Sequence, residues 1–264
     1  MSALTDEQRA AAAQALYDAE YDRAPIEAIS ATYPDADVED AYRISMAVTE
    51  LKVARGRTVK GHKIGLTSKP MQQLVGTDEP DYGSMFDDWF VLEGSTVDMA
   101  RLNRPLVEVE IAFVLSAPLT GTDNNAADVM RATDFILPAI EIVDTRYTGY
   151  GTNLLVDSVA DAASCGLVVL GSRPMRLTDL DLRREGAALY KNGLVEESGV
   201  AAAVMGNPVN AVVWLANKLG EFGVPMEAGN VILSGSFLKA IPFTGGDTFT
   251  ALFDTLGDVT FATA

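Results

Sequence analysis

The sequence predicts an α+β fold in which an N-terminal helical subdomain, residues 1–57, precedes a mostly β domain, residues 58–264. The N-terminal part is rich in helix formers and contains two helix-capping patterns. From residue 58 onward, short apolar runs are broken by glycine, proline and aspartate, which is typical of strands joined by turns. With 264 residues, 48% of them hydrophobic, the chain is long enough to bury a sizeable core.

Two helices are expected in the N-terminal subdomain. Residues 5–24 form the first, because Thr5 is followed three residues later by Gln8, as in a capping box. The second begins after Asp37 and ends near Gly56. Its apolar stripe consists of Ala41, Ile44, Val48 and Leu51.

The second domain is expected to contain short strands and one long helix. The expected strands are residues 90–97, 106–115, 136–143, 165–170, 230–234 and 248–253. In the helix, Asn207 is the cap, Pro208 occupies the first turn and Gly220 ends it. We expect this helix to serve packing.

Charge and composition exclude several classes of function. The net charge of −17 and the absence of a basic run disfavour binding to a nucleic acid. No apolar run is long enough to cross a bilayer, and the N-terminus lacks the apolar core of a signal peptide, so a cytoplasmic protein with no membrane partner is expected. Cys165 and His62 are single, which excludes an intramolecular disulfide and a Cys/His zinc site.

Three glutamates lie in otherwise apolar segments: Glu108 and Glu110 in one, Glu141 in another. Side chains alternate along a strand, so Glu108 and Glu110 point to the same face, roughly 6–7 Å apart. Because a buried carboxylate needs a partner, the trio predicts a shared cation. Oxygen ligands favour a hard ion, Mg²⁺ or Mn²⁺.

A simpler interpretation of Glu108 and Glu110 is the polar, exposed face of an antiparallel strand. Ala112 and Val114 share that face and argue against simple exposure.

Two further residues are candidates for acid/base chemistry. Lys63 lies between apolar and glycine residues, where an ammonium can bind an anionic substrate or donate a proton. Asp81 lies in the segment Glu79-Pro-Asp-Tyr-Gly83, from which a loop could deliver a carboxylate. Proline, aspartate and glycine also suit an ordinary turn, which is the simpler interpretation of Asp81.

Six motifs follow one another along the chain. They are Gly61-His-Lys-Ile-Gly-Leu-Thr-Ser-Lys69, Glu79-Pro-Asp-Tyr-Gly83, Val107-Glu-Val-Glu-Ile-Ala112, Leu137-Pro-Ala-Ile-Glu-Ile-Val-Asp144, Val159-Ala-Asp-Ala-Ala-Ser-Cys-Gly166 and Trp214-Leu-Ala-Asn-Lys-Leu-Gly220. Their sequence and order resemble those of 2-oxopent-4-enoate (vinylpyruvate) hydratases and their relatives. Over nearly its whole length the chain therefore resembles the hydratase/decarboxylase branch of the fumarylacetoacetate hydrolase superfamily. This resemblance implies a mixed β-sandwich/β-roll with an N-terminal helical subdomain.

The resemblance also implies a set of site residues. The three glutamates match the family's metal-binding carboxylates, and Lys63 and Asp81 match residues implicated in its proton transfers. The residues expected to contact the substrate are Leu66, Ser164, Ser236 and Lys239. A surface lysine is the simpler interpretation of Lys239.

The implied activity is that of a metal-dependent hydratase, a hydro-lyase of aromatic meta-cleavage catabolism that converts a 2-hydroxy-2,4-dienoate (2-oxo-4-enoate) to a 4-hydroxy-2-oxo acid. The substrate is either 2-oxopent-4-enoate, favoured by the loop 147–156, or 2-oxo-hept-4-ene-1,7-dioate, favoured by residues 234–242. The alternative is decarboxylation of 4-oxalocrotonate, a 2-oxo-3-enedioate. Asp81 favours the hydratase, because the decarboxylases tend to carry an apolar residue there.

Two positions depart from the family pattern: Ala162 stands where relatives usually have Asn, and Asn207 where many have His.

Two other classes of function stay open, a non-catalytic binding module and a carbon–carbon hydrolase. The first leaves the glutamate trio unexplained, and the second often needs a histidine base, for which only His62 is available. The resemblance implies a homo-oligomer and leaves open a complex with a partner enzyme of the same pathway.

Overall fold

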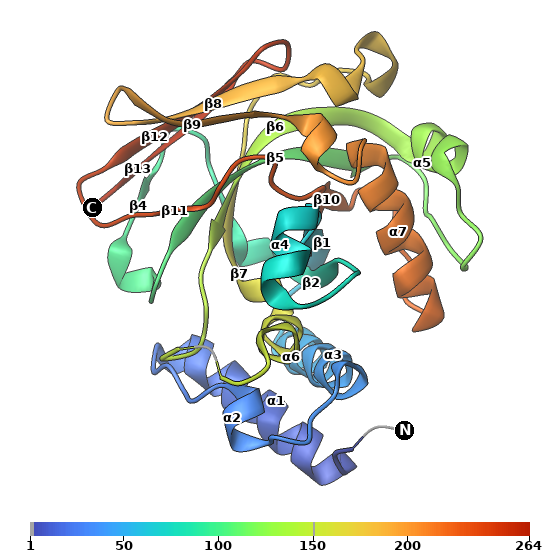
Figure 1. The fold of residues 1–264 in the computed structure, drawn as a ribbon, viewed down its shortest axis with the longest axis vertical. Coiled ribbons are helices and arrows are strands. Elements are labelled where there is room, and N and C mark those ends of the chain that lie inside the picture. Colours follow the sequence, from blue (N-terminus) through green and yellow to red (C-terminus); the bar gives the residue numbers. More distant parts are fainter. Residues whose placement is uncertain (1–2, 150) are drawn as a thin grey trace.

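The computed structural model describes residues 3–149 and 151–264. Figure 1 shows the N-terminal helices gathered at one end of the molecule, with two β-sheets at the other. Residues 1 and 2 of the predicted subdomain, and Tyr150 of the loop 147–156, lie outside the described residues. Within the described part, no helix is both long and apolar enough to cross a membrane.

The N-terminal helices form where the capping patterns predict them. They are α1 (Asp6–Asp22), α2 (Ile29–Thr32) and α3 (Val38–Ala54). Thr5 with Gln8, and Asp37 with Asp40, make reciprocal capping boxes. A helix from the middle of the chain, α6 (Leu154–Ala160), packs against α2 and α3. The helical layer therefore contains more than residues 1–57, and that domain boundary stays a prediction.

The larger sheet has eight strands, in the order β2-β1-β10-β5-β6-β7-β3, with β11 paired to β5. Their bounds are β1 Val59–Gly65, β2 Asp81–Phe86, β3 Phe90–Val91, β5 Leu106–Leu115, β6 Thr133–Val143, β7 Cys165–Leu170, β10 Val231–Leu233 and β11 Ile241–Pro242. The pairing is mixed: β10 runs parallel to β1 and antiparallel to β5. The predicted strands 106–115 and 165–170 are confirmed at both ends.

The smaller sheet has five strands, in the order β4-β13-β12-β8-β9, and packs over β6 and β7. Its strands are β4 Thr96–Val97, β8 Gly186–Lys191, β9 Leu194–Val200, β12 Thr248–Phe253 and β13 Asp258–Thr263. Phe249 and Phe261 stack at 5.1 Å between ring centroids, and Phe243 packs against both. This aromatic cluster lies in the core beneath the sheet.

The remaining elements are short, apart from α7 (Pro208–Glu221). The other helices are α4 Lys69–Val75 and α5 Ala126–Ala132, and the 3₁₀ turns are Asp87–Trp89, Met99–Arg101, Ala162–Ser164, Leu177–Asp179, Leu182–Arg184 and Ala201–Ala203. In Figure 1, α7 lies beside the larger sheet.

Three sequence-based expectations were wrong in detail. The run 90–97 is two strands of different sheets, because Gly94, with φ +75°, turns the chain between β3 and β4. The helix beginning at Pro208 passes through Gly220 instead of ending there. A Cβ at Gly220 would lie 2.0 Å from the Gly121 carbonyl oxygen, so this glycine permits a close approach of two backbones. Asp81 begins strand β2 and does not lie in a turn.

Candidate active site

The three glutamates meet on one face of the larger sheet. Glu108 on β5 pairs directly with Glu141 on the antiparallel strand β6, and Glu110 lies two residues further along β5. One carboxylate oxygen from each residue lies within 4.8 Å of those of the others, a spacing that a single cation can bridge. Glu110 and Glu141 have no exposed surface, and Glu108 is half-buried.

The charges of this trio are poorly compensated by the protein itself. Among the described residues, Glu110 Oε1 and Glu141 Oε2 are buried without a hydrogen-bond partner, and Glu141 Oε1 has the Lys63 ammonium 3.1 Å away as an ion-pair partner. Glu110 Oε2 accepts one hydrogen bond, 2.7 Å from the Gly235 amide nitrogen. Buried carboxylates normally have partners. Orphaned oxygens on an all-carboxylate set therefore fit a divalent cation with hard-ligand preference.

Burial and repulsion from neighbouring carboxylates raise the pKa values of Glu108 and Glu110. Burial raises the pKa of Glu108 to about 7, against the lowering effect of Lys63. For Glu110, burial and then the charges of Glu141 and Glu108 raise the pKa well above its ordinary value. The folded protein thus resists full ionisation of the trio without a compensating cation.

Lys63 lies beside the trio and partly compensates it. Its ammonium nitrogen lies 3.1 Å from Glu141 Oε1 and donates a hydrogen bond to the Ala163 carbonyl oxygen at 2.9 Å. Burial alone would lower the pKa of Lys63, but the charges of Glu141, Glu108 and Asp81 outweigh it and raise this pKa. Lys63 is therefore a cation held at the edge of the trio.

Asp81 approaches Lys63 across Gly65, its partner in the pairing of β1 with β2. A Cβ at Gly65 would lie 2.2 Å from Asp81 Oδ1 and 3.5 Å from Lys63 Nζ, so the absence of a side chain lets both groups come close. Asp81 Oδ2 accepts a hydrogen bond from Ser158 Oγ at 2.7 Å, and Oδ1 is buried with no hydrogen-bond partner in the described part of the chain. Burial raises the pKa of Asp81, although Lys63 and Ser158 oppose this effect.

The imidazole of His62 does not join this chemistry. His62 neighbours Lys63 on β1, so its side chain points to the opposite face of the strand. Burial lowers the pKa of His62 to about 4, which keeps the ring neutral. Cys165 is buried, and burial, followed by the charge of the nearby Glu141, raises the pKa of its thiol well above the ordinary value.

The four residues expected to contact substrate have different surroundings. Leu66 directly follows β1 with a left-handed φ of +55°, and Ser236 directly follows the glycine that donates to Glu110. The Ser164 hydroxyl is engaged with Asp161 at 3.2 Å, and the Ser236 hydroxyl donates to the Leu238 carbonyl. Lys239 is exposed, as its simpler interpretation expects. Their roles toward a substrate stay predictions.

Sequence reasoning missed the groups that hold Asp81, Lys63 and Glu110 in place. Ser158 holds Asp81, the Ala163 carbonyl holds Lys63, and the Gly235 amide holds Glu110. Two of these groups are main-chain atoms, which leave no side-chain signal in a sequence.

The chain is similar to known proteins over nearly its full length, although no family model matches it. It is 45% identical over 252 residues to the 2-oxo-hept-4-ene-1,7-dioate hydratase of Escherichia coli, covering 94% of each chain. It is 41% identical over 256 residues to the 2-keto-4-pentenoate hydratase of Paraburkholderia xenovorans, covering 97% of this chain and 95% of that one. A solved 4-oxalocrotonate decarboxylase from Pseudomonas putida G7, complexed with magnesium and adipate, is 35% identical with a TM-score of 0.96 over 100% of both chains.

Proposed function

The chain belongs to the hydratase and decarboxylase branch of the fumarylacetoacetate hydrolase superfamily, and on this premise we propose that it is a hydratase of 2-oxo-4-enoates. The observation that carries the proposal is the glutamate trio with unpartnered carboxylate oxygens, next to the buried ammonium of Lys63 and the buried carboxyl group of Asp81. The predicted superfamily fold is confirmed by the match to the solved decarboxylase.

Glu108, Glu110 and Glu141 are the proposed ligands of a divalent cation, Mg²⁺ or Mn²⁺. The solved relative contains magnesium, and the orphaned oxygens of this chain suit such an ion. When bound, the ion would act as a Lewis acid toward negative charge that develops on the substrate's 2-oxygen.

Lys63 and Asp81 are the proposed acid/base pair. In the proposed reaction, a 2-hydroxy-2,4-dienoate takes up a proton at C5 and loses the proton of its 2-hydroxyl, which gives a conjugated 2-oxo-3-enoate. Water then adds its oxygen to C4 and a proton to C3, and the product is a 4-hydroxy-2-oxo acid. Lys63 and Asp81 face each other across Gly65, so one residue can release a proton where the other accepts one.

The positive charge of Lys63 also contributes to binding. The chain carries a net charge of −17, which repels an anionic substrate at long range. The buried Lys63 ammonium close to the site is a local partner for a 2-oxo acid. The carboxylate of this substrate replaces part of the solvation that Lys63 loses through burial. We propose on the same grounds that the partner molecule is a small anionic 2-oxo acid.

The tail of the substrate distinguishes two members of this class, 2-oxopent-4-enoate and 2-oxo-hept-4-ene-1,7-dioate. The relatives named for these substrates are similarly close, at 41% and 45% identity. Lys239 is the proposed partner of a distal carboxylate, because its exposed ammonium has no ion pair among the described residues. A Lys239→Met variant that raises KM only for the dioate would support this role.

The test of the proposed function is an assay of the protein with Mg²⁺ on three substrates, followed by NMR. These are 2-hydroxypenta-2,4-dienoate, 2-oxo-hept-4-ene-1,7-dioate and 2-oxo-3-hexenedioate. A 4-hydroxy-2-oxo acid formed from either of the first two is the expected result. Carbon dioxide released only from the third would replace the hydratase with the decarboxylase alternative.

Assembly and location extend the proposal. We propose a cytoplasmic homo-oligomer, as the family resemblance implies, with a partner enzyme of the same pathway as a further candidate for complex formation. Light scattering on the purified protein tests the oligomer, and a monomer at micromolar concentration would contradict it.

A further inference from the structure

One short segment of the chain contacts both members of the proposed acid/base pair. It begins in α6 at Ser158 and ends in the 3₁₀ turn Ala162–Ser164. Ser158 Oγ donates to Asp81 Oδ2 at 2.7 Å, and the Ala163 carbonyl accepts from Lys63 Nζ at 2.9 Å. A displacement of this segment would therefore move both groups together.

The second half of the segment has an unusual backbone. Ala162, Ala163 and Ser164 all have left-handed conformations, with φ of +51°, +52° and +54°. Residues other than glycine rarely adopt this conformation, and then usually singly. Three in succession persist only if the surroundings fix them. The turn thus has to be held from outside.

Gly83 holds the turn on the side of β2. A Cβ at Gly83 would lie 2.0 Å from the Ala162 carbonyl oxygen and 2.8 Å from its Cα, so the strand and the turn touch backbone to backbone. Only glycine permits this approach.

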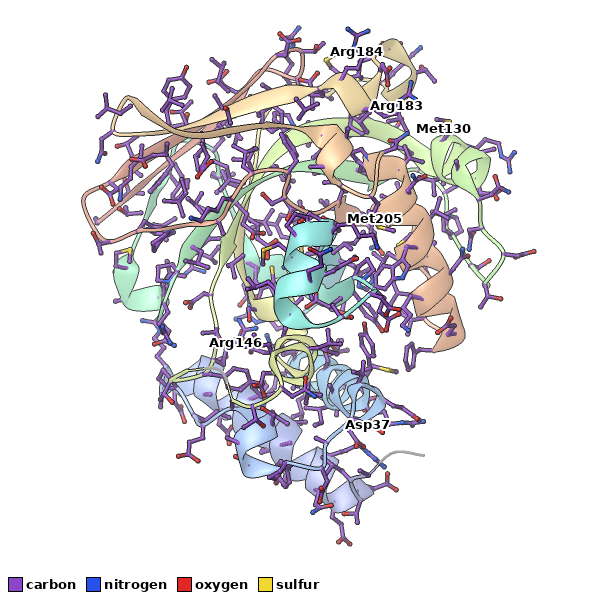
Figure 2. All side chains as sticks on the ribbon, in the orientation of Figure 1. Asp37, Met130, Arg146, Arg183, Arg184 and Met205 are labelled. Carbon is purple, nitrogen blue, oxygen red and sulfur yellow. The ribbon has the colours of Figure 1, made fainter. Side chains whose placement is uncertain are left out.

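Arg146 holds the turn at both of its ends. Its guanidinium donates to the Asp161 carbonyl before the turn, at 2.6 Å from Nη2, and to the Cys165 carbonyl after the turn, at 2.6 Å from Nη1. The same guanidinium donates from Nε to Asp161 Oδ1. Figure 2 places Arg146 between the N-terminal helices and the sheets. A planar fork of donors suits such a bracket, whereas an ammonium does not.

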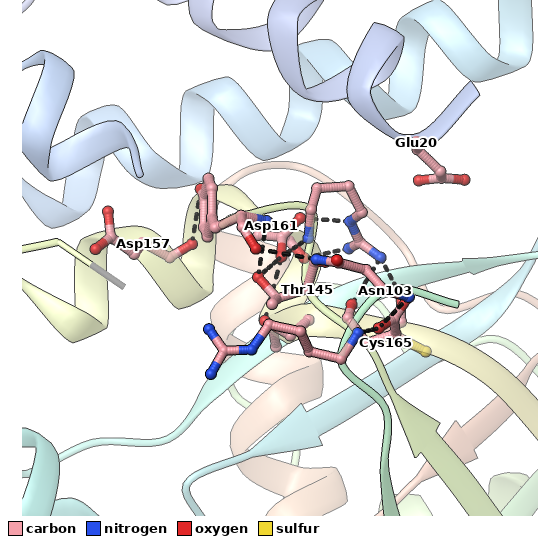
Figure 3. A network of polar contacts seen from close by, with 12 residues as sticks. Glu20, Asn103, Thr145, Asp157, Asp161 and Cys165 are labelled. Carbon is pink, nitrogen blue, oxygen red and sulfur yellow. Dashed lines mark hydrogen bonds and ion pairs between the residues drawn. The ribbon is translucent and has the colours of Figure 1, made fainter. Parts of the chain in front are cut away.

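Asp161 completes the network. Its Oδ2 accepts from the Thr145 hydroxyl, the Arg146 amide and the Ser164 hydroxyl, at 3.0, 3.1 and 3.2 Å. Figure 3 shows Asp161 and Thr145 side by side within this group of polar contacts. Both Arg146 and Asp161 are buried, and among the described residues neither forms a direct hydrogen bond with a glutamate of the trio. The network reaches Glu141 indirectly, through the Ala163 carbonyl and Lys63.

We infer that Ser158, Arg146 and Asp161 are positioning residues of the proposed reaction: Ser158 orients the Asp81 carboxylate, and the Arg146–Asp161 pair fixes the left-handed turn whose Ala163 carbonyl orients the Lys63 ammonium. This inference rests on the proposed acid/base roles of Lys63 and Asp81. Misplacing a reacting group by about 1 Å can cost on the order of 100-fold in rate without changing what binds.

The first test removes one hydroxyl. Ser158→Ala is expected to lower kcat about tenfold while KM and Mg²⁺ affinity stay within about twofold, because it removes the hydrogen bond that orients Asp81 and leaves the proposed metal ligands in place. Ser158→Thr retains the donor and is expected to restore kcat. The matched control is Ser30→Ala. The Ser30 hydroxyl donates at 2.9 Å to Asp157, the neighbour of Ser158 in α6, and does not touch Asp81. Equal kcat losses in Ser158→Ala and Ser30→Ala would overturn the role of Ser158.

The second test weakens the bracket around the turn. Asp161→Asn and Arg146→Lys are expected to lower kcat by roughly 100-fold with little change in Mg²⁺ affinity. Asp40→Asn is the control. Asp40, in α3, is also buried and pairs at 2.8 Å with Arg9 in α1. If the role of Asp161 were purely structural, Asp161→Asn and Asp40→Asn would both lower the melting temperature, and the two folded variants would have the same kcat. That result would overturn the inference.

A readout independent of turnover separates this inference from the proposed function. With ¹⁵N-labelled lysine, the Nζ resonance of Lys63, assigned by its loss in Lys63→Arg, is expected to shift in Asp161→Asn and to stay in place in Asp40→Asn. An unshifted resonance in both variants would refute the positioning of Lys63. A wild type that hydrates neither substrate, but shows the shift in Asp161→Asn, would instead refute the proposed function alone.

Discussion

Two neighbouring regions of the protein bury charged groups, and they differ in how fully those groups find hydrogen-bond partners. In the Arg146–Asp161 network, the guanidinium and both carboxylate oxygens have hydrogen-bond partners within the chain. In the glutamate trio, Glu110 Oε1 and Glu141 Oε2 have none among the described residues, and Glu141 Oε1 has the Lys63 ammonium as its ion-pair partner. A satisfied network stabilises one arrangement of the backbone, whereas an unsatisfied one stores repulsion that a ligand can relieve. The first region behaves as scaffold, and the second as a site prepared for a cation.

The largest expected effect comes from removing one charge of the trio. Glu110→Gln retains an acceptor for the Gly235 amide but removes a proposed ligand, so we expect at least about 100-fold loss of activity and of Mg²⁺ affinity. The metal-free variant is expected to gain about 1–3 kcal/mol in free energy of unfolding, because folding no longer has to bury a carboxylate that must take up a proton. Activity, isothermal titration with Mg²⁺ and denaturation in EDTA measure these changes.

Glu185→Gln is the matched control for this gain in stability. Glu185 is also buried, but its Oε1 accepts from the Thr255 and Leu256 amides at 2.7 and 3.0 Å. Neutralising it weakens charge-assisted hydrogen bonds and is expected to destabilise the protein. If both variants changed stability with the same sign, the contrast between satisfied and unsatisfied carboxylates would be wrong.

Gly83→Ala is expected to damage the scaffold region through sterics. A new Cβ only 2.0 Å from the Ala162 carbonyl oxygen must displace either β2 or the left-handed turn, so we expect a loss of about 3 kcal/mol in the free energy of unfolding. Gly186→Ala is the control, since its Cβ would meet nothing closer than 3.6 Å. Urea denaturation measures both, and equal losses would argue against a tight contact at Gly83.

The trio also predicts an unusual dependence of stability on pH. The pKa of Glu108 is raised to about 7 and that of Glu110 is raised further from its ordinary value, so the folded state binds protons that the unfolded state has released. The free energy of unfolding of the metal-free protein should therefore rise as pH falls through about 7 toward 4.5, by up to about 1.4 kcal/mol per pH unit for each proton.

Saturating Mg²⁺ should reverse this trend, because carboxylate ligands must be ionised to bind the metal. Denaturation in EDTA and in Mg²⁺, at several pH values between about 5 and 8, compares the two states. A metal-free protein that loses stability steadily on acidification would show that the trio is ionised when folded, contrary to the comparison drawn above.

The smallest expected effect concerns the strained turn. Ala162→Gly removes the steric cost of a left-handed alanine, and we expect it to raise the free energy of unfolding by about 0.5–1 kcal/mol. Ala162→Asn should act in the same direction, since asparagine adopts this conformation more readily than alanine. Ala160→Gly, at the end of α6, is the control and should destabilise. Thermal unfolding distinguishes these signs.

The sequence by itself determined the features that depend on near neighbours. The capping boxes at Thr5 and Asp37 set the starts of α1 and α3, because each cap acts within one helical turn. Alternation along β5 placed Glu108 and Glu110 on one face, since strand geometry has a period of two. The family resemblance supplied the superfamily fold, which the comparisons confirm, and named the candidate ligands.

Only the tertiary structure decided which distant groups meet. Pairing of β5 with β6 sets Glu141 opposite Glu108, and pairing of β1 with β2 sets Asp81 beside Gly65 and Lys63. The Ala163 and Gly235 backbones complete the site, and main-chain groups carry no residue-specific signal. Such contacts depend on register and on close approach between strands, helix and turn, which are fixed by packing over the whole domain and not by any local pattern of residues.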